Sequence, residues 1–384
     1  MKPDFVDVFG QESWVIENGT VGLSLTRRGG HMAPVWFGQD TDSPRQPYYV
    51  SPWQEEGLDI SAPVLVPLRG NFFCLPFGGG VDPATGTRLP LHGETACEEW
   101  TFESLRTEGD KTTASFRIHA HTGTVRKELT LREGHNAVYS RHVVEGYSGP
   151  FPLGHHAILD VDVPPGAIRV STSPFHIGLT APGIESAPLE EEYRSLLENA
   201  SFADLRAVPT GWQTAPDADL TRFPARDGFT DIAGVYKRAS REPAWTAAVC
   251  GHRNTLWLAL KDPSLLPATL LWIANRGRQA SPWNGRNRCL GIEDVCSYAA
   301  LGIEAATADN PVNREGIPTA VQLAPDEATT VPYIQAAAPV PTDFGAVQRV
   351  DFQEGGLVVY AESGDALEMP LDWPFVMAPR EDLG

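Results

Sequence analysis

Strict alternation of apolar and polar residues over 111–146 is the feature that most constrains this fold. In the first part of that stretch, apolar side chains occupy every second position: Ala114, Phe116, Ile118 and Ala120. Similar patterns follow over 125–131 and 137–144, with turn residues at 121–123 and 133–136. Because successive side chains of a strand point to opposite faces, the pattern predicts three antiparallel strands with one buried face.

A second hairpin is predicted near the N-terminus, where Asn18-Gly19 separates the apolar stretches 14–16 and 21–25. Asn-Gly favours the tight turn that joins two antiparallel strands. Short strands are also expected around the turns at 354–356 and 363–365. Four further stretches have the composition of strands: 255–262, 268–276, 288–295 and 297–306.

A chain of 384 residues would usually form two or three domains. It has no internal repeat, however, and its one loose connector, 336–345, is followed by too little chain for another domain. One helix is expected over 188–205, where acidic residues precede Leu and Tyr at helical spacing. We therefore predict a single all-β domain over 1–384, a large antiparallel two-sheet sandwich with one or two short helices.

The charge balance limits the partners. Thirty Lys and Arg against 49 Asp and Glu give a net charge of −19, which repels nucleic acid and anionic membranes. The five cysteines are widely spaced without a CxxC, which favours a reducing compartment over a disulfide framework or a zinc site. The N-terminus lacks a signal-peptide pattern, and no run of 18 apolar residues occurs, so we expect a cytoplasmic protein.

Arg69 is the first candidate site residue, because it precedes the apolar run 72–77. An arginine at the lip of such a run can donate two hydrogen bonds to a ligand hydroxyl, carboxylate or phosphate. The alternative is a surface arginine that caps a core strand.

His92 and Glu94 form the second candidate, since residues two apart share a face of a strand. They could bind a metal ion together or hydrogen-bond a sugar. The alternative is a turn with a solvated histidine.

The adjacent pair His155 and His156 lies in a predicted strand, so the two rings point to opposite faces. If His156 faces a cleft, Ile158 and Asp160 share its face, and His155 belongs to the core. Asp160 then becomes a candidate ligand of a sugar hydroxyl.

Glu293 stands in an apolar strand, after Leu290 and Ile292. A buried carboxylate costs several kcal/mol unless it is paired or faces a site, and burial raises its pKa towards that of a general base. The alternative is a salt bridge to Arg286 or Arg288.

The order of these segments resembles that of the galactose mutarotase-like superfamily, which includes aldose 1-epimerases and hexose-6-phosphate mutarotases. Four short motifs carry the resemblance: Arg69-Gly70 through Pro76-Phe77-Gly78, Leu91-His92-Gly93 with Trp100, Gly154-His155-His156, and Gly291-Ile292-Glu293. The resemblance runs from about residue 14 to 335. It implies a β-supersandwich with a sugar-binding cleft on one concave sheet.

The resemblance also implies a mechanism. In that superfamily a histidine protonates the ring oxygen of the sugar and a glutamate takes the proton of the anomeric hydroxyl, so the ring opens and recloses as the other anomer. His156 would be the acid and Glu293 the base. The implied substrate-binding residues are Arg69, His92, Glu94, Trp100, Asp160 and Trp283, with a tryptophan stacking on the sugar.

Two departures from the superfamily pattern bear on the substrate. Thr95, Ala96 and Cys97 follow His92-Gly93 where hexose-6-phosphate mutarotases carry an arginine, which argues against a phosphorylated sugar. Ala157 replaces the proline that follows the superfamily's histidine.

The leading hypothesis is therefore an aldose 1-epimerase-like isomerase that needs no cofactor and no metal. Two alternatives stay open: a non-catalytic sugar-binding protein, and a metal-dependent isomerase or lyase built from His92, Glu94, His156 and Glu293. The expected partner is a small-molecule carbohydrate, and a homodimer is left open.

Overall fold

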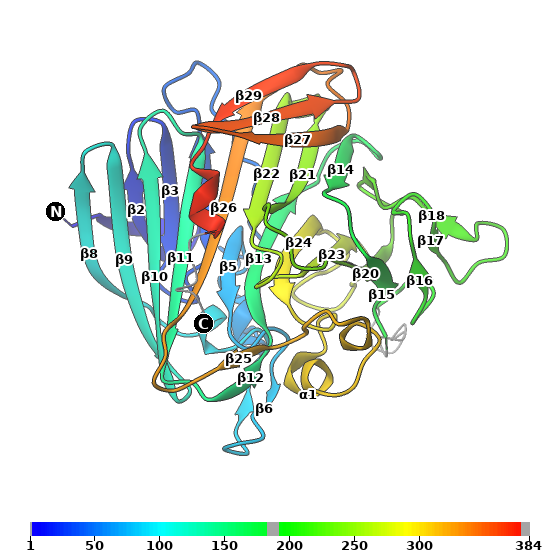
Figure 1. Cartoon of the computed structure of the whole chain (residues 1–384), viewed down its shortest axis with the longest axis horizontal. Helices are drawn as coiled ribbons and strands as arrows, with labels where there is room; N and C mark the ends of the chain where they lie inside the picture. The colour runs from blue at the N-terminus through cyan, green and yellow to red at the C-terminus, as the bar shows by residue number, and fades with distance from the viewer. Residues whose placement is uncertain (1, 183–191, 378–384) are drawn as a thin grey trace.

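Two large antiparallel β-sheets stack face to face in the computed structural model of this chain, which describes residues 2–182 and 192–377 (Figure 1). The predicted hairpin is present, with residues 11–17 paired to 21–26. The predicted three-stranded meander is present over 111–145. The all-β two-sheet architecture expected from the alternation is thus confirmed.

The first sheet has eleven strands and carries the candidate site. Its strands, in spatial order, are β1 (Asp4–Val8), β2 (Gln11–Glu17), β3 (Val21–Thr26), β4 (Met32–Phe37), β5 (Asn71–Cys74), β13 (Leu153–Asp160), β24 (Arg288–Cys296), β23 (Ala268–Asn275), β20 (Phe229–Tyr236), β15 (Ile177–Thr180) and β16 (Ser201–Phe202). Its centre is built from segments far apart in the sequence, because β13 pairs with β5 on one side and with β24 on the other.

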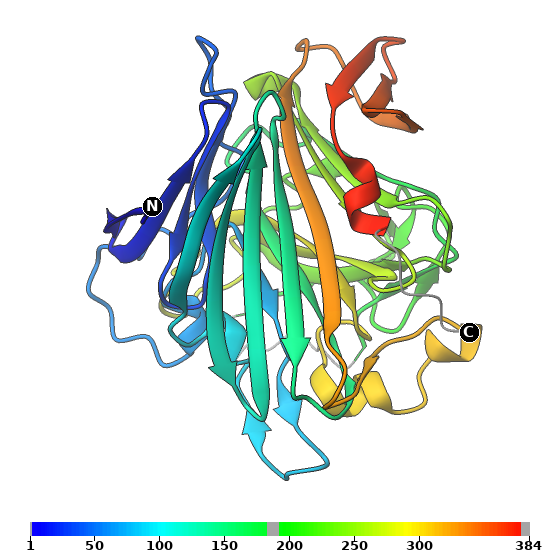
Figure 2. The ribbon, with the colours of Figure 1, turned by 60° about the vertical axis from the view of Figure 1, so that its left-hand side comes forward.

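The second sheet has nine strands and includes the meander, which runs through the front of Figure 2. Its strands, in spatial order, are β19 (Arg222–Phe223), β14 (Ile168–Thr172), β21 (Ala244–Cys250), β22 (Thr255–Lys261), β26 (Thr329–Pro339), β11 (Ala137–Glu145), β10 (Gly123–Arg132), β9 (Lys111–Ala120) and β8 (Thr101–Glu108).

The main core fills the space between the two sheets. Most strands of both sheets contribute one face to it, for example Val125, Leu129 and Leu131 from β10 and Leu23 from β3. A second apolar cluster lies on the other face of the eleven-stranded sheet, where Phe72, Ile158 and Trp272 are covered by loops. The central strands of this sheet are therefore buried on both faces.

The C-terminal strands β27 (Val347–Gln353), β28 (Gly356–Ala361) and β29 (Ala366–Pro370) form a three-stranded sheet over the outer face of the nine-stranded sheet (Figure 1). The predicted turns at 354–356 and 363–365 join them. Three short two-stranded ladders complete the strands: β6 (Gly80–Val81) with β7 (Arg88–Leu89), β12 (Gly149–Phe151) with β25 (Val321–Leu323), and β17 (Val208–Pro209) with β18 (Asp217–Ala218).

Helical segments are few and short in the described part of the chain. The α-helix α1 spans Gly302–Thr307. The 3₁₀ segments are η1 (Pro63–Leu65), η2 (Glu94–Ala96), η4 (Gly251–Arg253), η5 (Asn313–Glu315) and η6 (Trp373–Met377). None of the described helices has the length and apolar character that crossing a membrane requires.

Three sequence predictions need correction. The helix expected over 188–205 is absent from residues 192–205, which carry β-bridges and the short strand β16, while 183–191 lie outside the described residues. The strand expected over 297–306 is a turn followed by α1, because Gly302 at φ +81° packs against the backbone of Gly79. The connector expected over 336–345 is half strand, since β26 extends to Pro339 and its alanines are buried.

Candidate functional site

Strand register brings His156 and Glu293 together. They occupy directly opposed positions on β13 and β24, in the centre of the eleven-stranded sheet. The Nε2 atom of His156 lies 3.0 Å from Oε1 of Glu293, and the two side chains are 5% and 3% exposed. Neither Arg286 nor Arg288 pairs with Glu293, because these arginines bind Glu56 and Asp162 instead.

The two adjacent histidines have different surroundings, as their alternation on β13 requires. The His156 ring stacks on Phe72 at 4.6 Å between centroids and meets Trp272 edge-on at 5.7 Å, both in the outer apolar cluster. The His155 ring stacks on Tyr333 at 4.2 Å, in the core between the sheets. Only His156 therefore faces the side on which Glu293 lies.

Gly291 explains how the Glu293 carboxyl fits so close to the sheet. It lies two residues before Glu293, on the same face of β24, and pairs across the sheet with Trp272. A Cβ atom at position 291 would lie 2.8 Å from Oε1 of Glu293 and 3.0 Å from Cβ of Trp272. The absence of a side chain at Gly291 thus provides the space into which the carboxyl and the indole pack.

Burial sets the electrostatics of the pair. It raises the pKa of Glu293 to about 8, against a smaller lowering effect from the charge of Arg278. Burial lowers the pKa of His156 well below its usual range, and the neighbouring rings of His92 and His31 lower it further. Both effects disfavour charge, so at neutral pH the carboxyl holds its proton and the imidazole is neutral.

Two polar atoms of the pair are unused. Oε2 of Glu293 and Nδ1 of His156 are buried and have no hydrogen-bond partner among residues 2–182 and 192–377. Buried polar atoms are normally hydrogen-bonded, and an exception can mark a catalytic role or a bound water. These two atoms can offer hydrogen bonds to a bound molecule.

His92 completes a triangle of rings on this face. Its ring meets His156 edge-on at 5.0 Å and packs against Phe77 at 4.9 Å. It lies in a turn at φ +63° rather than in a strand, and burial lowers its pKa to about 3. Its Nδ1 accepts a hydrogen bond from the backbone N–H of Gly78.

Glu94 does not share a face with His92, contrary to the strand prediction. Gly93 at φ +78° turns the chain, and Glu94 begins η2. The Glu94 carboxylate accepts the backbone N–H of His121, on the β9–β10 turn. The side chains of this His-Gly-Glu turn thus point to different partners.

Arg69 and Trp100 are both engaged with protein groups. The Arg69 side chain is fully buried. Its guanidinium donates hydrogen bonds to the carbonyls of Val8 and Phe9 at 2.7 and 2.9 Å, and these bonds stabilise the β1–β2 turn. Trp100 belongs to the core between the sheets, where its Nε1–H donates to the Thr95 carbonyl at 2.9 Å. Neither the surface position considered for Arg69 nor a stacking position for Trp100 is present.

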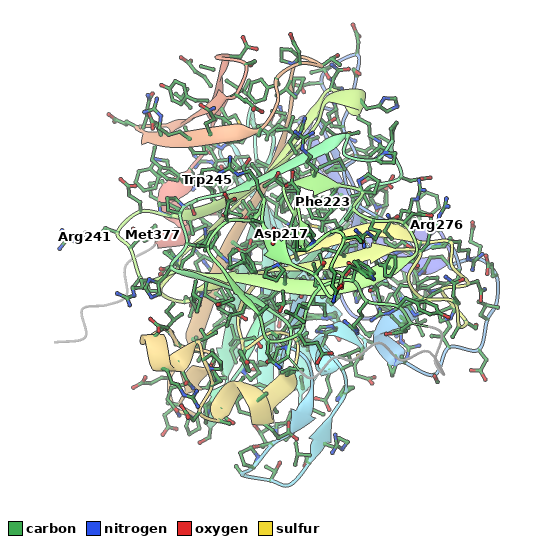
Figure 3. All side chains as sticks on the ribbon, turned by 90° about the vertical axis from the view of Figure 1, so that its right-hand side faces the viewer. Asp217, Phe223, Arg241, Trp245, Arg276 and Met377 are labelled. Carbon is green, nitrogen blue, oxygen red and sulfur yellow. The ribbon has the colours of Figure 1, made fainter. Side chains whose placement is uncertain are left out.

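Asp160 and Trp283, the other two predicted residues, have different surroundings. Asp160, at the end of β13, forms an ion pair with Arg253 at 3.1 Å. Trp283 lies in the loop that follows β23, and this loop begins at Arg276 (Figure 3). The Trp283 ring packs against Trp53 at 4.9 Å and Trp272 at 5.9 Å. Of the predicted residues, His156, Glu293, His92 and Trp283 therefore belong to one aromatic cluster.

Sequence reasoning missed Phe72, Trp272 and Arg278. Phe72 and Trp272 contact the His156 ring. The Arg278 guanidinium lies over the rings of Trp272 and Trp283, at 5.6 and 5.0 Å. The sequence does show a tryptophan in the apolar stretch 268–276. The sheet face to which it points cannot be inferred from alternation, because both faces of that strand are buried.

The metal-site alternative finds no support in the side-chain arrangement. No group of three or more His, Cys, Asp or Glu side chains in the described ranges is placed to hold a metal ion. In particular, Glu94 points to the β9–β10 turn and not to His156.

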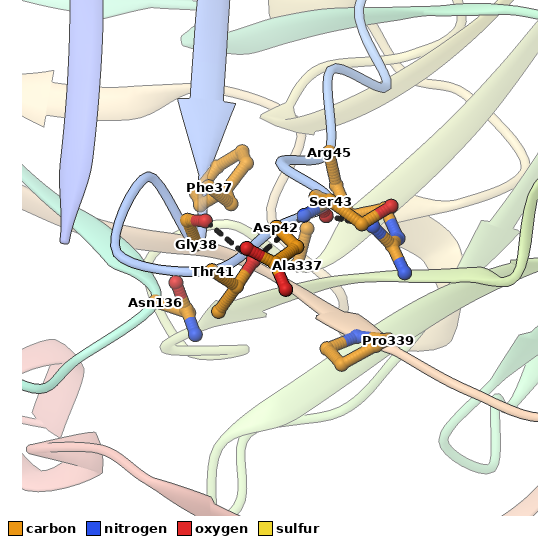
Figure 4. A pocket seen from close by; sticks show the side chains of 9 residues that line it. All are labelled: Phe37, Gly38, Thr41, Asp42, Ser43, Arg45, Asn136, Ala337 and Pro339. Atoms are coloured by element: carbon orange, nitrogen blue, oxygen red, sulfur yellow. Dashed lines mark hydrogen bonds between the residues drawn. The ribbon is translucent and has the colours of Figure 1, made fainter.

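A pocket of about 230 Å³ lies elsewhere, between the end of β4 and β26 (Figure 4). It is lined by Phe37, Gly38, Thr41, Asp42, Ser43, Arg45, Asn136, Ala337 and Pro339. None of the candidate site residues is among them.

This arrangement of two large sheets defines an all-β protein with the galactose mutarotase-like fold. Among solved structures, a putative aldose 1-epimerase from Klebsiella pneumoniae superposes with a TM-score of 0.58 at 14% identity, over 87% of this chain and 80% of that one. A putative aldose 1-epimerase from Escherichia coli K12 gives 0.53 at 14% identity, over 86% and 100%.

A galactose mutarotase-like protein from Clostridium acetobutylicum gives a TM-score of 0.56 at 12% identity, over 88% of this chain and 98% of that one. No protein-family model matches the chain, and no curated protein matches its sequence. At these identities the likeness establishes the fold, and the resemblance stated from the short motifs is confirmed at that level.

Proposed function

We propose that this chain interconverts the anomers of an aldose, with His156 and Glu293 as the proton-transferring pair. The observation that carries the proposal is the direct cross-strand contact of an imidazole and a carboxyl, 3.0 Å apart in a shell of aromatic rings. The fold that surrounds it is shared with putative aldose 1-epimerases.

The proton count of the pair suits a reaction that must run in both directions. Ring opening needs one proton given to the ring oxygen and one taken from the anomeric hydroxyl, and ring closure reverses both transfers. An imidazolium with a carboxylate carries as many protons as an imidazole with a carboxylic acid. His156 and Glu293 can therefore exchange the roles of acid and base between the two half-reactions.

Substrate binding must separate the pair, because a pyranose ring does not fit between two atoms 3.0 Å apart. In the bound state each group would give up its contact with the other and form a hydrogen bond to the sugar. His92, whose ring borders His156, would hydrogen-bond a sugar hydroxyl, and Trp272 or Trp283 would pack against the apolar face of the ring.

The proposal is tested by exchange NMR between the anomers of a panel of aldoses and uronic acids. We expect acceleration by the wild-type chain and a loss of at least about 100-fold in Glu293→Gln and His156→Gln. Glu315→Gln is the matched control, since Glu315 forms an exposed pair with His176 at 2.9 Å. Full activity in Glu293→Gln, or no acceleration with any sugar, would refute the proposal.

A sugar-binding protein without catalysis is the second candidate. The observation that favours it is the closed state of the pair, whose side chains contact one another at 3.0 Å and are at most 5% exposed. Calorimetric binding of a sugar that survives both substitutions, without any anomer exchange, would favour this candidate over the first.

A further inference from the structure

The loop between β23 and β24, residues 276–287, is unusually basic for this chain. With Arg288 it carries four arginines, and no acidic residue occurs between 276 and 292, although the whole chain has a net charge of −19. Three of these arginines bind carboxylates on the outer surface: Arg276 binds Asp227, Arg286 binds Glu56, and Arg288 binds Asp162. The fourth, Arg278, has a different setting.

Arg278 lies next to the proposed catalytic pair. Its guanidinium lies over the indoles of Trp272 and Trp283, and the Trp272 ring is itself 5.7 Å from the ring of His156. One indole thus separates the guanidinium from the pair. The charge of Arg278 also lowers the pKa of the Glu293 carboxyl, against the larger effect of burial.

Arg278 already holds a carboxylate. Glu192 comes from a distant part of the chain, and its Oε1 lies 2.8 Å from Nε of Arg278. Its Oε2 lies 3.6 Å from an Nη atom of Arg194. Two guanidinium groups therefore converge on one carboxylate at the edge of the aromatic cluster, and this carboxylate belongs to the protein itself.

We propose that the site takes an aldose that carries a carboxylate, a uronic acid, and that Arg278 binds this carboxylate in place of Glu192. This inference rests on the proposed function, and it names the substrate class of the same site. A pyranose stacked on Trp272 would have the His156–Glu293 pair at one end and Arg278 at the other. Its carboxylate would replace Glu192 with no net change in the charge around the guanidinium.

The need to keep a negative charge beside Arg278 would make the site select uronates over neutral sugars. Side chains 278 and 192 are only 21% and 23% exposed, so a partly buried guanidinium that lost Glu192 without a replacement would be costly. A neutral sugar offers no anionic replacement, whereas a uronate does. The basic loop also offsets, locally, the repulsion that an acidic protein exerts on an anionic substrate.

The test compares anomer exchange of glucuronate and galacturonate with that of glucose, galactose and glucose 6-phosphate. For the wild-type chain we expect kcat/KM to be at least about 10-fold higher for the uronates than for the neutral sugars. Arg278→Gln should abolish this preference by lowering kcat/KM for the uronates at least about 10-fold more than for the neutral sugars, while Arg278→Lys retains part of the preference. Glu192→Gln should lower KM for the uronates only.

Arg117→Gln is the control, because Arg117 on β9 forms an ion pair with Glu103 on β8, away from the site. Equal rates for neutral and acidic sugars, a preference for the phosphate, or an equal effect of Arg278→Gln on every sugar would overturn the inference. If no sugar is turned over, the proposed function fails by itself. Calorimetry with glucuronate on the wild type and Arg278→Gln then decides: binding lost in the variant supports the inference, and no binding or unchanged binding refutes it.

Discussion

Asp294 accepts a hydrogen bond from the Tyr333 hydroxyl at 2.7 Å, on the interior face of the strand whose outer face carries Glu293. The same carboxylate binds Lys261 at 2.5 Å and the Thr269 hydroxyl at 2.7 Å. Asp294 is paired across the sheet with His155, and His155 stacks on Tyr333. On the opposite face of the sheet from the proposed catalytic pair, a buried polar cluster around Asp294 thus joins the two sheets.

This buried group leads to a prediction about stability. Removing one partner of a buried ion pair leaves the other charge uncompensated, so Asp294→Asn and Lys261→Met should each cost about 3–5 kcal/mol of unfolding free energy. The double variant should cost clearly less than the sum of the two single changes. Urea denaturation of the four proteins measures the coupling. Additive costs would show that the 2.5 Å contact contributes nothing to the folded state.

Tyr333→Phe serves as the milder companion experiment. It removes one hydroxyl from Asp294 and keeps the ring that stacks on His155, so we expect a cost of about 1–2 kcal/mol. A loss as large as that of Asp294→Asn would mean that the ring, and not the hydrogen bond, has been disturbed.

The sequence predicts the fold best where one face of a strand meets solvent. On β10 the buried residues alternate with partly exposed ones, and the meander was found at the predicted position. On β13 and β24 nearly every residue is buried, because loops cover the outer face of the sheet. Alternation disappears from such strands, and their faces must be inferred from neighbouring residues such as the adjacent histidines.

Predictions of local geometry around the candidate site had different outcomes. The His155–His156 doublet was separated correctly, since alternation along a strand is a local property. The His92–Glu94 prediction was wrong about the backbone, because Gly93 has φ +78° and ends the extended run. The helix expected over 188–205 is absent from 192–205. There the backbone pairs with residues 278 and 210 in β-bridges, in spite of the helical spacing of the apolar residues. Such tertiary contacts leave no trace in a local pattern.

Gly291→Ala should impair the site more than the fold. The new methyl group would lie 2.8 Å from Oε1 of Glu293, so the carboxyl must move away from His156. We expect at least about a 10-fold loss in anomer exchange and a stability cost of about 1–3 kcal/mol. Gly211→Ala is the control, because no heavy atom beyond its two chain neighbours lies within 4 Å of a Cβ built there. Wild-type exchange rates in Gly291→Ala would show that the position of the carboxyl does not matter.

The raised pKa of Glu293 predicts a pH-dependent stability with a definite sign. The folded chain holds the carboxyl proton up to a pKa of about 8, whereas the ordinary value is 4.5. The folded state therefore binds more protons than the unfolded state. The contribution of Glu293 to the unfolding free energy is fully present below about pH 4.5 and is lost as the pH rises through 8. Glu293→Gln lacks this loss, so its unfolding free energy relative to the wild type should be about 4 kcal/mol more favourable at pH 9 than at pH 5.

Urea midpoints between pH 5 and pH 9 measure this difference. Glu315→Gln is again the control, since the side chain of His176 lowers the pKa of Glu315 and the sign is opposite. Parallel stability curves for the wild type and Glu293→Gln would show that the carboxyl is charged in the folded chain at neutral pH.

The two histidines of β13 provide the last prediction, because alanine at either position removes the same ring from opposite faces of one sheet. His155 is fully buried and stacks on Tyr333, so His155→Ala should cost about 2–4 kcal/mol while the folded fraction keeps its rate of anomer exchange. His156→Ala should lose at least about 100-fold in rate, because the proton partner of Glu293 is gone. Denaturant titration and exchange NMR on both variants separate the two effects. Equal losses of rate at both positions would mean that the sheet transmits any disturbance to the site, and that the alternation does not divide core from chemistry.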